Sequence, residues 1–140
     1  MNPANQKIIV SEPSYAWKSE VTSRIEELIR LEPGWDGYKG QPVSLENGHF
    51  ALNILESIYA DNVPAPQIVP GVNGDLQLEW HTPSVEIELH ILAPYEVQVW
   101  VIDSENFPEG RELELSMDFT DIAHQLKNLK EHSSDCVSAA

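Results

Sequence analysis

The sequence predicts a single α+β domain, in which two helices precede an antiparallel meander of four or five strands and a third helix follows it. Three observations support this fold class. Apolar residues recur at helical spacing between residues 17 and 58, the periodicity then changes from 3.6 to 2, and turn residues separate the later segments at short, regular intervals. We expect the domain to span residues 1–132, followed by a disordered tail at 133–140, where apolar periodicity ends.

The two N-terminal helices are predicted from apolar spacing and from their end signals. The first helix carries the stripe Trp17, Val21, Ile25, Leu28 and Ile29. Pro33-Gly34 ends this pattern sharply. Ser44 has the residue type of an N-cap for the second helix, and Glu46 lies in the first turn, where a carboxylate meets the positive end of the helix dipole.

Alternation of apolar and polar residues predicts the strands. The inward set should be Leu76, Leu78, Trp80, Ile87, Leu89, Val99 and Val101, with the helices on that face. Turns are expected at 73–75, 81–84 and 93–96, a loop at 106–110, and a weaker strand at 112–115. The closing helix should begin near Asp118 and bury Phe119, Ile122, Ala123, Leu126 and Leu129.

The charge of the chain limits the partners that we expect. Eight Lys and Arg against 23 Asp and Glu give a net charge of −15. Because nucleic-acid binding depends on cations that displace counterions, direct DNA or RNA binding is not expected, nor is binding to an anionic membrane. The first residues lack the pattern of a signal peptide and the single cysteine, Cys136, has no partner for an internal disulfide, so we expect a cytoplasmic protein.

GWDGYKG at 34–40 is the most unusual segment, because it sets two large aromatics among glycines between two helices. Trp35 and Tyr38 in this segment have the composition of a recognition surface. The interpretation that we favour is structural: Gly34, Gly37 and Gly40 permit positive φ, while Trp35 packs between helices and sheet. Asp36 would then accept backbone N–H groups within the turn.

These residues also carry a resemblance. The pieces that carry it are Gly34 to Tyr38, Pro42 to Ser44, the prolines between 66 and 70, Gly74-Asp75, and the strand LQLEW followed by His81. Together they resemble a family of small, acidic, largely uncharacterised bacterial proteins. The similarity covers residues 34–92 and implies a shared architecture rather than a mechanism. Members of this family resemble proteins that occur in mobile or defence-linked gene pairs, which implies an antitoxin-like or inhibitor role.

His81 and His90 are the candidate metal ligands, since both point outward from neighbouring strands beside Glu79, Glu86 and Glu88. Imidazole and carboxylate suit zinc, but an acidic polar face also carries histidines without any metal, and no HExxH spacing or cysteine pair is present. The motifs of nucleophilic and phosphate-binding sites are absent too. We therefore expect no catalytic residues and no cofactor.

Trp100 and Ile102 should point outward, because Val97, Val99 and Val101 occupy the inward positions of the same strand. An aromatic and an aliphatic residue on an acidic face are typical of an interface core with a charged rim. Alternatively, the N-terminal segment around residues 8–10 covers them.

The function predicted from these observations is non-catalytic binding of a basic protein surface, as in an antitoxin-like or anti-defence inhibitor. The contact residues would be Trp100, Ile102, Glu79, Glu86 and Glu88. Two alternatives remain open: a metal-binding protein or hydrolase that uses His81, His90 and the neighbouring glutamates, and a structural homo-oligomer.

Overall fold

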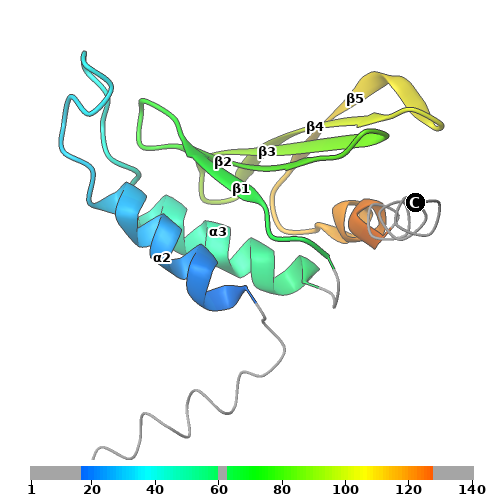
Figure 1. Cartoon of the computed structure of the whole chain (residues 1–140), viewed down its shortest axis with the longest axis horizontal. Coiled ribbons are helices and arrows are strands. Elements are labelled where there is room, and N and C mark those ends of the chain that lie inside the picture. The colour runs from blue at the N-terminus through cyan, green and yellow to red at the C-terminus, as the bar shows by residue number, and fades with distance from the viewer. Residues whose placement is uncertain (1–16, 60–62, 128–140) are drawn as a thin grey trace, which may run out of the picture.

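A computed structural model describes residues 17–59 and 63–127 and shows the predicted α+β architecture (Figure 1). α2 (Lys18–Ile29) and α3 (Leu45–Ile58) are followed by β1 (Gln67–Pro70), β2 (Leu76–His81), β3 (Val85–Ala93), β4 (Glu96–Asp103) and β5 (Phe107–Leu115). A C-terminal helix then occupies residues 120–127. The strands form one five-stranded antiparallel sheet in the order β1-β2-β3-β4-β5, so the predicted meander is confirmed.

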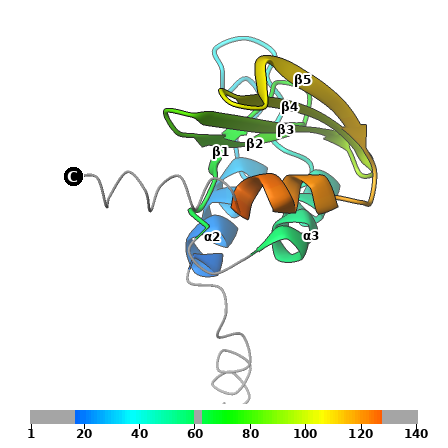
Figure 2. The ribbon, with the colours of Figure 1, turned by 90° about the vertical axis from the view of Figure 1, so that its right-hand side faces the viewer.

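The helices cover one face of this sheet and leave the other face open. Figures 1 and 2 show α2, α3 and the C-terminal helix on the same side of the strands. All seven residues that were predicted to face the helices are buried. They meet apolar side chains of the helices, which include Ile25 and Leu28 of α2, Ile54 and Leu55 of α3, and Ile122 and Leu126 of the C-terminal helix.

The start of α3 agrees with its predicted capping signal. Ser44 has extended backbone angles, and its hydroxyl accepts a hydrogen bond from the Asn47 amide at 3.1 Å. The cap satisfies one of the backbone N–H groups that the first turn of a helix leaves unpaired. Glu46 lies in this first turn, as expected.

β5 is longer than the sequence pattern indicated. The predicted loop at 106–110 is wrong from Phe107 onward, because the strand begins there rather than at Glu112. The pairing of β4 with β5 shifts register between Val101 and Asp103, and Gly110 has a φ of +90°. This irregular pairing accommodates a proline and a glycine that normally indicate a loop.

Neither α2, α3 nor the part of the C-terminal helix that is described has the length and hydropathy of a membrane-spanning segment. The predicted tail at 133–140, with Cys136, lies outside the described residues. The N-terminal segment that was considered as a cover for the open face, and Leu129, lie outside them as well.

Candidate functional site

The open face of the sheet is strongly acidic. Paired residues of antiparallel strands share a face, so the register identifies the outward positions. They are Gln67 and Val69 on β1; Gln77, Glu79 and His81 on β2; Glu86, Glu88 and His90 on β3; Gln98, Trp100 and Ile102 on β4; and Glu112 and Glu114 on β5. Five of these outward residues are glutamates and none is Lys or Arg. Two histidines, His81 and His90, are the titratable groups of opposite sign among these positions, so the face offers mainly negative charge.

Two of these glutamates are direct cross-strand neighbours. Glu79 pairs with Glu88, and Glu88 pairs in turn with Trp100. Side chains in such pairs have Cβ atoms about 4.5–5.5 Å apart, and like charges at this spacing destabilise a sheet. The fold thus carries an unfavourable interaction that a bound cation would relieve.

Polar contacts tie Glu79 to its neighbours. One carboxylate oxygen accepts a hydrogen bond from Gln77 Nε2 at 2.5 Å, and the other lies 3.0 Å from His81 Nε2. The other ring nitrogen of His81 is 3.7 Å from a Glu86 oxygen. The hydrogen bond to Glu79, with further attraction from Glu86 and Glu88, raises the pKa of His81 above its usual value.

The two histidines predicted as candidate metal ligands do not share a site. His81 pairs with Glu86, whereas His90 pairs with Gln77, so they are separated by four positions along the strands. At about 3.3 Å per residue, this is roughly 13 Å, too far for one ion to bind both. Instead, ligand atoms of Glu79, His81 and Glu88 lie within 4.8 Å of one another. A histidine with two carboxylates is a donor set that zinc accepts.

His90 belongs to a different contact. Its Nε2 lies 2.5 Å from Asp75 Oδ2, while Asp75 Oδ1 accepts from the Asn73 amide at 3.0 Å. Burial raises the pKa of Asp75, but the hydrogen bonds from His90 and Asn73 outweigh it and hold this pKa below its usual value. A carboxylate that orients an imidazole is one half of an acid–base site. Here the same carboxylate also holds the turn before β2 through its bond from the Asn73 amide, and it requires glycine at position 71, where a Cβ would collide with it.

A groove of about 410 Å³ runs along the open face beside these residues. Its lining is Gln77, Glu88, His90, Gln98, Val99, Trp100, Glu112, Leu113 and Glu114. This lining contains no Ser, Thr or Cys nucleophile and no cationic side chain other than a histidine. With three glutamates and Trp100 in its lining, the groove suits a cationic ligand that also contacts an aromatic ring.

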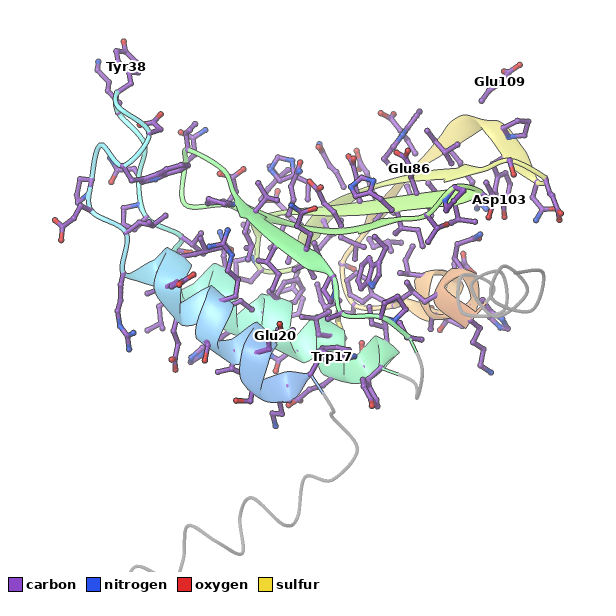
Figure 3. The ribbon with its side chains drawn as sticks, in the orientation of Figure 1. Trp17, Glu20, Tyr38, Glu86, Asp103 and Glu109 are labelled. Carbon is purple, nitrogen blue, oxygen red and sulfur yellow. The ribbon has the colours of Figure 1, made fainter. Side chains whose placement is uncertain are left out.

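Trp100 lies on β4 between Glu88 and Glu112 of the neighbouring strands, and its ring packs on β5. It is half-buried, and a Cβ built on Gly110 would lie 2.3 Å from two carbons of the indole ring. Glycine at position 110 therefore lets the ring pack closely against the strand. Ile102 is half-buried as well and pairs with Glu86. The five residues predicted as partner contacts thus occur together on one face, as Figure 3 illustrates for Glu86.

The GWDGYKG segment forms a closed loop that projects from the body of the protein, with Tyr38 at its tip (Figure 3). The Gly34 amide donates to the Gly40 carbonyl at 2.7 Å and closes the loop. Asp36 accepts from the amides of Tyr38 and Gly40, as predicted, and these two bonds lower its pKa. Tyr38 itself is 77% exposed.

Trp35 does not pack between helices and sheet, so that prediction is wrong. It is half-buried, it lies outside the hydrophobic core, and its indole N–H donates to the Gln41 carbonyl at 2.7 Å. Trp35 thus stabilises its own loop through this hydrogen bond. Gly34 and Gly37 have positive φ as expected, but Gly40 does not, so that part of the prediction is wrong. Glycine is favoured at position 40 for a different reason, because a Cβ there would lie 2.7 Å from Asp36 Oδ1.

The base of this loop is anchored to the turn before β2. The Gln41 amide donates to Val72, and the Ser44 amide donates to Gly74. Asn47, which is buried, adds a 2.8 Å bond from its side chain to the Gly74 carbonyl. No sequence pattern indicates this role, because an asparagine in the first turn of a helix is usually exposed.

Sequence reasoning also missed Glu112 and Glu114 as members of the acidic face. The alternation Glu-Leu-Glu-Leu was visible, but its register against β4 depends on the irregular pairing at the start of β5. No protein-family model, no curated protein and no solved structure matches this chain with significant similarity.

Proposed function

We propose that this chain is a non-catalytic binding protein whose open sheet face receives a basic surface of a protein partner. The observation that carries the proposal is the set of five outward glutamates, without Lys or Arg among the outward positions, around the half-buried Trp100. Interfaces of this composition use the aromatic residue for desolvated contact and the charges for attraction and orientation.

The cross-strand pair of Glu79 and Glu88 strengthens this argument. Two carboxylates in direct opposition do not contribute to the stability of a sheet, so stability alone does not explain the pair. Cationic side chains of a partner would neutralise the pair on binding, and the negative field would accelerate their approach. An antitoxin-like or inhibitor role, in a family with the GWDGY corner, is the form of this function that we favour. A cytoplasmic location suits a chain with a single cysteine.

The experiment uses the purified protein as bait in an extract of its native cell. Wild type is compared with a Glu79→Gln/Glu88→Gln variant and with a Glu26→Gln/Glu32→Gln control, which changes the net charge equally through exposed residues away from the sheet. After the captured partner is identified and purified, its association rate is measured at low and high salt. We expect slower association, with a weaker salt dependence, for the face variant alone. Equal effects of both variants would show that only net charge matters.

A metal site is the second candidate function, supported by the proximity of Glu79, His81 and Glu88. Calorimetric titration with zinc, together with metal analysis of the purified protein, tests it directly. Stoichiometric zinc that is lost in a His81→Ala variant but retained in a His90→Ala variant would favour this function over protein binding. His90→Ala is the appropriate control because His90 is bonded to Asp75 and lies outside the cluster.

A further inference from the structure

β5 forms an open edge of the sheet. Within the described part of the chain, its backbone is hydrogen-bonded to β4 and to no other element. The opposite edge is different: β1 has four residues, ends in Pro70, and its Ile68 carbonyl accepts a bond from the Arg24 side chain on α2. Proline and a covering helix are common protections of a sheet edge, so β5 is the edge at which another strand can pair.

The regular part of β5 is its second half. Residues 111–115 pair in continuous register with residues 101–97 of β4. The first half contains Pro108, which has no N–H to donate, and Gly110, whose φ of +90° departs from strand geometry. An added strand would therefore pair with residues 111–115, where every second N–H and C=O points away from β4.

The side chains at this edge alternate in character. Glu112 and Glu114 lie on the open face, where they line the groove beside Trp100. Leu113 and Leu115 lie on the helix-covered face, are half-buried, and pack against the core. A strand bound along this edge would place alternate residues opposite the two glutamates and the others opposite Arg111 and the two leucines, which share the second face.

From this arrangement we infer that β5 binds an extended segment of the partner, in which Lys or Arg alternates with apolar residues, as a sixth strand of the sheet. The inference rests on the proposed function and specifies the partner's chemistry. Basic residues of the segment would face Glu112 and Glu114, and apolar residues would extend the contact of Leu113 and Leu115. Main-chain bonds supply affinity in this mode of recognition, and alternate side chains supply specificity.

Charge favours such a segment over a second copy of the chain. Antiparallel pairing of β5 with itself would bring the glutamates of two copies onto one continuous face. Each copy also carries a net charge of −15, so two copies repel one another. A basic segment instead neutralises the carboxylates that it meets.

The test uses a short capped peptide of alternating lysine and valine as the probe, with the protein labelled for NMR. We expect binding to protect alternate amides within 111–115 from hydrogen exchange, because the intervening amides are already bonded to β4. The same peptide with N-methyl groups on its pairing edge keeps its charge and loses its donors, so it should bind about tenfold more weakly or worse. Equal binding by both peptides would overturn the inference.

A charge-reversal variant sharpens the result. Glu112→Lys/Glu114→Lys should lose the lysine–valine peptide and bind a glutamate–valine peptide, whereas the control Glu20→Lys/Glu26→Lys on α2 should keep the original preference. Protection of β1 amides would contradict the inference. So would a wild-type dimer, detected by ultracentrifugation, in which the amides of 111–115 are protected without any peptide. If the lysine–valine peptide does not bind but Glu79→Gln/Glu88→Gln still slows association of the native partner, strand addition is wrong and the proposed function stands. If that variant has no effect, the proposed function fails independently.

Discussion

The contact between Trp100 and Gly110 gives the sharpest prediction for the candidate site. Gly110→Ala would place a methyl group 2.3 Å from two ring carbons of Trp100 and 3.1 Å from a third. Distances this short are not tolerated between carbon atoms, so either the ring or β5 must move. The substitution tests directly whether the indole packs against the strand at position 110.

Two effects contribute to its cost. An L-residue held at the φ of +90° observed for Gly110 costs about 1–2 kcal/mol. Displacement of a packed ring adds about 1–3 kcal/mol, the usual range for overpacking. We therefore expect Gly110→Ala to lower the free energy of unfolding by about 2–5 kcal/mol.

The two effects separate in a double-mutant cycle. In a Trp100→Ala background the methyl group meets no ring, so Gly110→Ala should cost only the backbone part, about 1–2 kcal/mol. Gly37→Ala is the matched control, since Gly37 has a φ of +84° and a Cβ there would have no neighbour within 4 Å. It should cost the backbone part alone in either background.

Chemical denaturation followed by far-UV circular dichroism measures all of these variants, because this signal does not depend on the tryptophan that is removed. Equal costs of Gly110→Ala in the wild-type and Trp100→Ala backgrounds would refute the contact. Trp100 would then be free of β5 and fully available to a partner.

Three further predictions concern stability. Trp35→Ala should lower the free energy of unfolding by about 1–2 kcal/mol, below the ~3–5 kcal/mol of a buried aromatic, because Trp35 lies outside the core. A larger loss of stability in thermal unfolding would place Trp35 in the core. Asp103→Ala should cost about 2–4 kcal/mol, since the buried carboxylate accepts four hydrogen bonds, two of them from side chains. Burial raises the pKa of Asp103, but its hydrogen bonds lower this pKa overall. The stability that they contribute is therefore complete above the pKa of the unfolded carboxyl group and disappears as the pH falls through the folded pKa. A wild-type-to-variant difference in unfolding free energy that stays constant in acid would contradict the assignment. Glu88→Gln should raise stability by about 0.2–1 kcal/mol at low salt by relieving its repulsion with Glu79, and Glu32→Gln should not; melting temperatures at low and high salt compare the two.

The parts of the fold that depend on simple periodicity could be predicted from the sequence. Alternation in LQLEW and VEIELHI assigns residues to two faces wherever the strand is regular, because the side-chain period of a strand is two. This is why Glu79, Glu86 and Glu88 were placed correctly on the open face with Trp100. Ser44 was identifiable as a cap because its role depends only on residues within one helical turn.

The parts that depend on contacts between distant residues could not be predicted. The size of Trp35 favoured a position in the core, but its indole N–H donates to a carbonyl six residues away within its own loop. The separation of His81 from His90 follows from the register of β2 and β3, which residue types alone do not specify. The early start of β5 depends on a shift in register against β4, which a proline and a glycine conceal in the sequence.

The order of strands in the sheet also has a consequence for how the chain folds. Each strand pairs with the one that precedes it, so every pairing closes a short loop and costs little chain entropy. Sheets built from such local pairings fold faster than Greek-key sheets of similar size. Because α2 and α3 leave the ribosome first, the growing sheet can pack on them hairpin by hairpin in the order of synthesis. β5 joins last, and its outer edge is then the final backbone of the sheet to become available for pairing.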